Sequence, residues 1–353
     1  MKRSEILAIL DLSSAALAKE GEKIVPTFAG FKLDGVYITS HDDIVAVRLP
    51  FKTDFKGVAP AHTLLKFLKA CTKDEVEITA KKEELTVKCG RPKLTLSMTS
   101  LDSFPFQFPK FSGKIIRDLN DDFFTGLALC SKVVSDHGLS SWVGGLVFDF
   151  GKALRLYSTS DSRDCICAYS LPKLGVDGAE RLVISLPVSF VKIAMDMRRV
   201  FKDVGAQLGI RDNYAIISFG DKASVMGKVI DPTGRPDIPT RIREHLKSKS
   251  SGGVPLSKSV HNLFSRAAAV SGKDERCSLS VVHGKLRLGL QSGPMQFDDG
   301  VALKGEHAKI TVTVDPRLSL KMMDQCDTFR VLEGSMVLWR GSKFTYITAN
   351  KNV

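Results

Sequence analysis

Pairs of adjacent aspartates are the feature of this 353-residue chain that most resembles a site for chemistry. They occur at Asp42–Asp43, Asp121–Asp122 and Asp298–Asp299, and paired carboxylates can hold a metal ion or exchange protons. Each pair, however, falls in an expected turn or at an expected helix start, where aspartate oxygens accept hydrogen bonds from nearby backbone N–H groups. The sequence therefore favours a structural role for these pairs over catalysis or metal binding.

Other patterns typical of catalysis or metal binding are incomplete. Cys165 and Cys167 form a C-x-C pair, but no second pair of ligands has the spacing of a zinc site, so we expect buried free thiols. The stretch GLSSW (138–142) lacks the second glycine of a nucleophile elbow, because Trp142 stands there. No phosphate-binding loop, dinucleotide fingerprint or H-E-x-x-H motif is present. We expect a protein that is not an enzyme and that needs no cofactor or metal.

The charge balance points to a polyanionic partner. The chain carries a formal net charge of +12 and has an isoelectric point of about 9.3, which makes nucleic acid the first candidate. A basic surface that merely keeps the protein in solution is the alternative, and composition alone does not distinguish the two. No apolar run reaches the roughly 18 residues of a membrane span, and charged residues interrupt the apolar residues near the amino terminus. We therefore expect a cytoplasmic protein with no membrane partner.

Many of the basic residues fall on one side of expected helices. His62, Lys66, Lys69 and Lys73 follow helical spacing, opposite a row of leucines that can face a core. Any surface helix has a charged outer face, but such basic stripes recur along the chain, and they could contact phosphates without reading sequence. The candidate DNA-binding residues are Lys66, Lys69, Lys73, Lys132, Lys192, Arg199, Lys258, Arg266, Arg317 and Lys321.

The helices that carry these stripes belong to a repeated unit. A strand, a proline and a helix follow one another at 57–69, 183–195 and 310–323, with the prolines at 60, 187 and 316. Proline suits the first turn of a helix, where its missing N–H would have no partner. A strand–turn–strand precedes each unit and alternating strands follow it, and a further helix is predicted at 3–19, 120–135 and 257–271.

The repeat predicts an α+β protein made of three copies of one module, each with two helices packed on antiparallel sheets. The expected domains are 1–113, 114–242 and 243–353. Two stretches are predicted to be linkers: 103–114, which is rich in proline and phenylalanine, and 231–255, which is rich in proline, glycine and charge.

Several stretches resemble one known family, the sliding clamp of bacterial replicative DNA polymerase (its beta subunit) and the phage-encoded relatives. These stretches are VPTFAGFKLDGVYITSHDDIVAV, SFPFQFP, KVIDPTGRPDIP, LFSRAAAVSGKDERCSLSVVHGKLRL and FTYIT. Each is weak alone, but they occur in the family's order and span essentially the whole chain.

The resemblance implies a head-to-tail homodimer, a closed ring around double-stranded DNA with helices inside and sheets outside. It implies the replicative polymerase and the clamp loader as partners, and a role in processive synthesis. Phe104 and Phe106 would face Ala269 and Val270 at the subunit interface. The resemblance also implies a pocket for partner peptides, formed by Thr159, Arg163, Ile242, Tyr346 and Ile347.

Two departures from the family pattern stand out. The chain ends in the polar ANKNV (349–353), where family members have an apolar tail, and Asp164 replaces an apolar residue beside the implied pocket. Both indicate a different set of partner peptides. An alternative remains, namely a basic nucleic-acid-binding protein that is derived from the clamp fold but does not encircle DNA.

Overall fold

In a computed structural model, the chain folds into two compact units. Unit 1 comprises residues 1–124 and 186–229, and unit 2 comprises residues 125–185 and 230–353. The structure describes residues 2–18, 29–111, 115–134, 145–160, 165–175, 181–211, 213–230, 237–247, 253–272, 275–304, 309–332 and 336–348. Within these ranges, no helix is long and apolar enough to cross a membrane.

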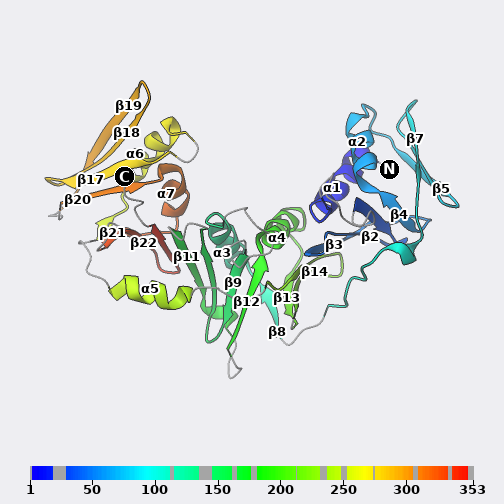
Figure 1. Cartoon of the computed structure of the whole chain (residues 1–353), viewed down its shortest axis with the longest axis horizontal. Coiled ribbons are helices and arrows are strands. Elements are labelled where there is room, and N and C mark those ends of the chain that lie inside the picture. The colour runs from blue at the N-terminus through cyan, green and yellow to red at the C-terminus, as the bar shows by residue number, and fades with distance from the viewer. Residues whose placement is uncertain are drawn as a thin grey trace. The chain divides into compact units, whose positions relative to one another are not determined.

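Within the residues that the structure describes, unit 1 contains one large and one small antiparallel sheet together with α-helices (Figure 1). The large sheet has the order β4 (Gly57–Pro60), β1 (Gly30–Leu33), β2 (Tyr37–His41), β3 (Val45–Pro50), β15 (Ala223–Lys228), β14 (Tyr214–Phe219), β13 (Ala206–Ile210), β8 (Ile115–Leu119). The small sheet has the order β5 (Glu77–Lys81), β6 (Glu84–Lys88), β7 (Lys93–Ser97). The helices are α1 (Arg3–Ser14), α2 (Ala61–Ala70) and α4 (Val188–Val200).

Unit 2 is built in the same way, with one large and one smaller antiparallel sheet. The large sheet has the order β12 (Leu182–Pro187), β9 (Gly145–Phe150), β10 (Leu154–Thr159), β11 (Cys165–Leu171), β23 (Phe344–Thr348), β22 (Met336–Arg340), β21 (Thr328–Leu332), β16 (Val254–Pro255). The smaller sheet has the order β19 (Met295–Ala302), β18 (Lys285–Ser292), β17 (Cys277–Val282), β20 (Ile310–Val314). The helices are α3 (Asp121–Ser131), which begins in unit 1, α5 (Ile238–Lys247), α6 (Lys258–Val270) and α7 (Pro316–Met323).

The order of elements repeats along the chain. A helix, four strands, a second helix and three strands occur as α1 to β7, as α3 to β15 and as α6 to β23 within the described residues. One more short strand precedes the second and third copies, β8 and β16 respectively. In the first copy an isolated bridge between Lys2 and Glu75 stands in the corresponding place beside β5. The prediction of a mixed helix and antiparallel-sheet fold is therefore confirmed.

The predicted helix starts are confirmed by their capping bonds. The backbone N–H of Phe123 donates to Asn120 Oδ1 at 3.1 Å, and the N–H of Val260 donates to Ser257 Oγ at 3.4 Å. In α7, Pro316 occupies the first turn and Asp315 accepts from the N–H of Leu318 at 2.9 Å. Such bonds satisfy backbone donors that have no partner inside the helix.

Each large sheet packs a helix against one face. In unit 1, Phe190 of α4 is fully buried, and a Cβ added at Gly227 of β15 would lie 2.8 Å from its ring. Glycine therefore permits the close approach of helix and strand, and burial of a phenylalanine side chain contributes about 2–3 kcal/mol. In unit 2, Gly126 of α3 has the same role against Tyr169 and Leu156.

Within the described residues, parts of both predicted linkers have a defined structure. In the first, Phe106 stacks on His41 of β2 with ring centroids 4.1 Å apart, and Phe108 lies against the guanidinium of Arg48. These contacts hold the segment 104–111 on one face of the large sheet of unit 1. In the second, the residues Ile238–Lys247 form α5, a helix that the proline and glycine content of the segment obscures.

Candidate functional site

Helix α5 packs on the large sheet of unit 2 (Figure 1). Residues of the helix and of the sheet together line a groove. Its buried residues Ile238 and Ile242 pack on a cluster that includes Tyr157 of β10, Ile166 of β11 and Ile347 of β23. These strand residues share one face of the sheet, since Ile166 pairs directly with Ile347. The helix is therefore held by apolar contacts across several strands.

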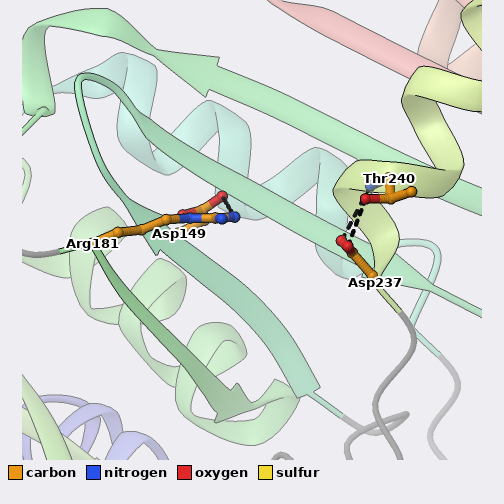
Figure 2. A network of polar contacts seen from close by, with 4 residues as sticks. All are labelled: Asp149, Arg181, Asp237 and Thr240. Carbon is orange, nitrogen blue, oxygen red and sulfur yellow. Dashed lines mark hydrogen bonds and ion pairs between the residues drawn. The ribbon is translucent and has the colours of Figure 1, made fainter.

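Asp237 fixes the start of α5 (Figure 2). Its Oδ1 accepts from the N–H of Thr240 at 3.1 Å, and its Oδ2 accepts from the Thr240 hydroxyl at 2.5 Å. These bonds, with a smaller contribution from Arg243, lower the pKa of Asp237 below its ordinary value. A carboxylate at this position stabilises the helix through both the hydrogen bonds and the helix dipole.

The groove beside α5 has a volume of about 520 Å³. Apolar groups of Tyr157, Ala168, Pro239 and Ile242 are part of its lining. Burial raises the pKa of the Tyr157 hydroxyl above its ordinary value, so the phenol is neutral. A concave site with an apolar lining and a few polar groups is typical of ligand recognition.

An ion pair forms part of the lining of the groove. Arg181 donates from Nε to Asp149 Oδ1 and from Nη2 to Asp149 Oδ2, both at 2.8 Å (Figure 2). Asp149 lies on β9 with its side chain 3% exposed, whereas the side chain of Arg181 is 60% exposed. The bidentate contact raises the pKa of Arg181. A second, smaller hollow of about 270 Å³ adjoins the pair and extends to Asp237.

The rim of the groove is basic. Five cationic side chains and one carboxylate, that of Asp149, line the groove within the described residues. The cations are Lys152, Arg155, Arg181, Arg243 and Lys343. They come from the β9–β10 turn, β10, the residue directly before β12, α5 and the β22–β23 turn, so segments distant in sequence assemble this rim.

The structure brings some of the predicted pocket residues together. Ile242 lines the groove, and Thr159, Ile166 and Ile347 form one row across β10, β11 and β23 on the face that α5 covers. Tyr346 points to the opposite face, as neighbouring strand residues must, and its hydroxyl donates to Cys165 Sγ at 3.4 Å.

Arg163 and Asp164 lie outside the described residues. The assignment of the pocket residues remains a prediction.

The predicted DNA-binding residues of unit 1 lie on exposed helix surfaces. They are Lys66, Lys69, Lys73, Lys192 and Arg199, on or directly after α2 and α4. Lys69 lies 2.7 Å from a carboxylate oxygen of Asp11 of α1, and Arg199 lies 2.7 Å from one of Asp196. Such exposed pairs are weak, so a phosphate can compete for these cations.

In unit 2 the corresponding residues are Lys132, Lys258, Arg266, Arg317 and Lys321, all exposed. Helices α6 and α7 lie side by side (Figure 1). Lys132 follows α3. Its pKa is lowered first by partial loss of water around the ammonium group and then by repulsion from Lys321 of α7. These two cations therefore belong to one cluster.

Two of these arginines in unit 2 make local contacts. Arg266 donates to Asp299 of β19 at 2.5 Å, and Arg317 donates to the carbonyl of Ala268 at 3.1 Å. These bonds direct both guanidinium groups towards their own unit. The DNA-binding role of all ten residues remains a prediction.

The predicted interface residues belong to different units: Phe104 and Phe106 to unit 1, and Ala269 and Val270 to unit 2. Phe104 is buried in unit 1, where Lys32 Nζ lies 5.6 Å from its ring centroid, and Phe106 contacts His41. Val270 is 41% exposed at the end of α6, next to the exposed Ala269. Their role between subunits is a prediction that a single chain does not test.

The aspartate pairs have mainly structural contacts. Asp42 accepts from the N–H groups of Ile44 and Val45 at 2.9 and 2.7 Å, as expected for a turn. The expectation that Asp298–Asp299 lies in a turn is wrong, because both residues are inside β19. In the part of the chain that the structure describes, no group of three histidine, cysteine or acidic residues could hold a metal ion.

The expectation of buried thiols at the C-x-C pair is met by Cys167 and only in part by Cys165, which is half-buried. None of the seven cysteines forms a disulfide, and five of them are buried. Cys165 and Cys167 lie on the same face of β11, where Cys167 Sγ is 3.5 Å from Cys130 Sγ.

Sequence reasoning missed the basic rim and its ion pair. One signal was available: Asp149 interrupts the apolar run LVFDF, and a charged residue in a buried strand requires a partner. The identity of that partner, Arg181, follows only from the pairing of β9 with neighbouring strands. Lys152, Arg155 and Lys343 have no distinctive sequence pattern.

Comparison with solved structures shows one recurring likeness over the whole chain. The DNA polymerase III subunit beta from Pseudomonas aeruginosa superimposes with a TM-score of 0.76 at 16% identity, covering 100% of this chain and 99% of that chain. The beta subunit from Thermotoga maritima gives a TM-score of 0.78 at 17% identity, covering 100% and 98%. The Helicobacter pylori beta clamp, in a complex with a DNA ligase peptide, gives 0.78 at 15% identity, covering 100% and 99%.

The chain thus has the fold of bacterial DNA polymerase sliding clamps. At these identities the likeness shows the fold alone. No protein-family model and no curated protein matches the sequence.

Proposed function

We propose that this chain is a DNA sliding clamp, a non-enzymatic homodimeric ring that encircles double-stranded DNA and tethers a replicative polymerase for processive synthesis. In this proposal the chain consists of three modules, with boundaries near residues 113 and 242, and their helices face the hole of the ring. The clamp loader and the polymerase are the expected protein partners. The fold likeness supports the class, and the sheet topology carries the ring.

The single observation that carries the proposal is that each of the two smaller sheets ends in an edge strand, β7 or β19, that pairs with another described strand along one side only. The large sheet of unit 1 joins four strands of the first copy to four of the second through β3 and β15. The large sheet of unit 2 joins the second copy to the third in the same way, through β11 and β23. By the same pattern β19 should pair with β7, but each of these strands forms the edge of its own small sheet.

These two edges suit each other. On β7, Leu94 is half-buried and Lys93 is exposed; on β19, Phe297 is half-buried and Asp298 is exposed. Antiparallel pairing between copies would bury the apolar residues and place opposite charges on the outer side. Because β7 and β19 are different surfaces, their pairing is head-to-tail, and a head-to-tail interface produces a ring when the rotation closes.

The polyanion inside the proposed ring is double-stranded DNA. The exposed cations of the helices would attract its phosphates. Phosphate contacts give affinity without sequence readout, so the ring could slide. We further propose that the groove beside α5, with Ile242 in its lining and Thr159 and Ile347 on the adjoining sheet face, receives a peptide from the polymerase.

Retention on circular and linear DNA tests this function. The protein is loaded onto a closed circular plasmid with a clamp loader, and retained protein is measured before and after a single cut in the DNA. An encircling ring stays on the circle and leaves the cut molecule through its ends. Equal retention on both forms would instead indicate a surface binder that does not encircle DNA.

A further inference from the structure

The charges around the groove beside α5 define the chemistry of its occupant. We propose that this groove selects an acidic peptide segment, one with an apolar anchor side chain flanked by carboxylates. The inference rests on the proposed tethering function and adds the selectivity of its peptide site. It follows from the charged side chains of this chain, which a likeness of fold alone does not predict.

The basic rim is the first observation. Lys152, Arg155, Arg181, Arg243 and Lys343 all line the groove and are exposed, and Asp149 is the one carboxylate beside them in the described lining. That carboxylate is already bound to Arg181 through both oxygens. The field in the groove is therefore positive, and it favours a negatively charged ligand over a neutral one.

Arg181 is held in an orientation that suits carboxylate recognition. Its contacts with Asp149 use Nε and Nη2, so Nη1 lies on the edge of the guanidinium that faces away from Asp149. A planar guanidinium fixed along one edge retains donors along the other. Because the side chain is 60% exposed, an incoming carboxylate can reach these donors without removing the ion pair.

The apolar lining provides the place for an anchor. Tyr157, Ala168 and Ile242 line the groove together with the cations, and its volume of about 520 Å³ falls within the usual range for ligand pockets. A peptide that places a leucine or phenylalanine side chain there gains apolar burial. The flanking carboxylates then meet the cations on the rim.

A peptide suits this arrangement better than a nucleic acid strand. The cations come from five separate places in the chain, and apolar side chains line the same groove. Single-stranded nucleic acid is typically bound along a continuous basic track with exposed aromatic platforms. Here Tyr157 is 4% exposed, so its ring offers little surface for a base.

The test uses short fluorescent peptides and the full chain. The peptides share one Leu-Phe anchor and differ in the flanking residues, which are all glutamate, all glutamine or all lysine. We expect the glutamate peptide to bind at least about tenfold more tightly than the glutamine peptide at low salt, and the lysine peptide to bind weakest. The preference should shrink as salt is added, because exposed charges are screened.

Variants locate the effect. R155Q combined with K343Q should weaken the glutamate peptide by about tenfold and the glutamine peptide by less than about twofold. The matched control combines K285Q with K309Q, two exposed lysines that do not line the groove, and should leave both affinities unchanged. Circular dichroism confirms that each variant is folded.

Each result decides the question. Equal affinity for the glutamate and glutamine peptides would overturn the acidic selectivity, even where the groove still takes an apolar anchor. Binding of no peptide would overturn it as well, whereas failure of the tethering function itself would appear separately, as equal retention on circular and linear DNA. A third result would be that a single-stranded oligonucleotide displaces the glutamate peptide and binds the combined R155Q and K343Q variant about tenfold more weakly. That result would identify nucleic acid, and not a peptide, as the occupant of the groove.

Discussion

Arg181 forms a bidentate ion pair with Asp149 in which the two partners differ sharply in exposure. The side chain of Asp149 is 3% exposed, whereas that of Arg181 is 60% exposed. The cost of breaking the pair therefore depends on which partner is removed. A guanidinium left alone regains water, but a carboxylate left alone stays in a strand whose six residues are all buried.

This asymmetry gives the first prediction. Arg181→Gln should lower the free energy of unfolding of unit 2 by about 1–3 kcal/mol, because it leaves the buried carboxylate of Asp149 without a charged partner. Asp149→Asn keeps the shape and one acceptor, and should cost less than about 1 kcal/mol. Scanning calorimetry measures both, since it resolves units that unfold separately. A larger loss for D149N than for R181Q would contradict the explanation.

The second prediction concerns His41 in unit 1. Burial, the largest cause, lowers the pKa of His41 to about 4 in the folded protein, against about 6.5 for an unperturbed histidine. Asp43 opposes this shift and Lys228 adds to it. As the pH falls, the unfolded chain takes up the proton first, so the stability that the neutral ring provides is complete above about pH 6.5 and is lost progressively towards about pH 4.

The loss should reach roughly 3 kcal/mol at the acid end of this range. His41→Phe keeps a ring to stack on Phe106 and has no proton to gain, so it should remove this part of the pH dependence. Urea unfolding of both proteins through the same pH series measures the difference. Parallel curves for the wild type and H41F would show that another group titrates.

The third prediction concerns the basic helix faces. Reversing the charge of Lys66, Lys69 and Lys192 together should weaken retention on circular DNA and reduce the salt slope of binding by about 3, as expected for the loss of three phosphate contacts. Binding is measured by fluorescence anisotropy across a salt series.

Its control reverses Lys52, Lys81 and Lys82, which are exposed on loops and strands of the same unit. Unchanged retention in the helix variant, or an equal loss in the control, would contradict the proposal that these helix faces contact DNA inside the ring.

The sequence predicts the repeated elements well because their signals are local. The prolines at 60, 187 and 316 and the caps at Asn120 and Ser257 act within a few residues, and the structure confirms them. Helix α5 is missed because its stability comes from Ile238 and Ile242 packing on distant strands. Local composition cannot reveal such contacts.

The same distinction applies to the candidate site. Ile242 and Ile347 belong to one apolar cluster, whereas Tyr346 faces the other side of its strand. The resemblance identifies a stretch of sequence, but it does not say which face of the sheet each of its residues occupies. The basic rim depends on the meeting of five elements, two of them turns. No sequence periodicity predicts that these five segments come together in the folded chain.

The fourth prediction tests the edge strands that would pair in the proposed ring. Leu94→Asp places a charge on the half-buried side of β7, at the edge proposed to pair with β19 of a second copy. A charge at the centre of a new apolar contact is costly, so the dimer should dissociate at least about a hundredfold more readily than the wild type. Sedimentation velocity across a concentration series measures the shift.

The matched control lies at the other edge of the same small sheet. Ile78 of β5 is also half-buried on an edge strand, so Ile78→Asp disturbs its own sheet to a similar degree. It should nevertheless leave the dimer intact, because β5 has no counterpart in the proposed pairing. Equal dissociation of the L94D and I78D variants would mean that damage to the sheet, and not loss of the β7 edge, breaks the dimer. A wild-type protein that is monomeric at every concentration would exclude the head-to-tail pairing itself.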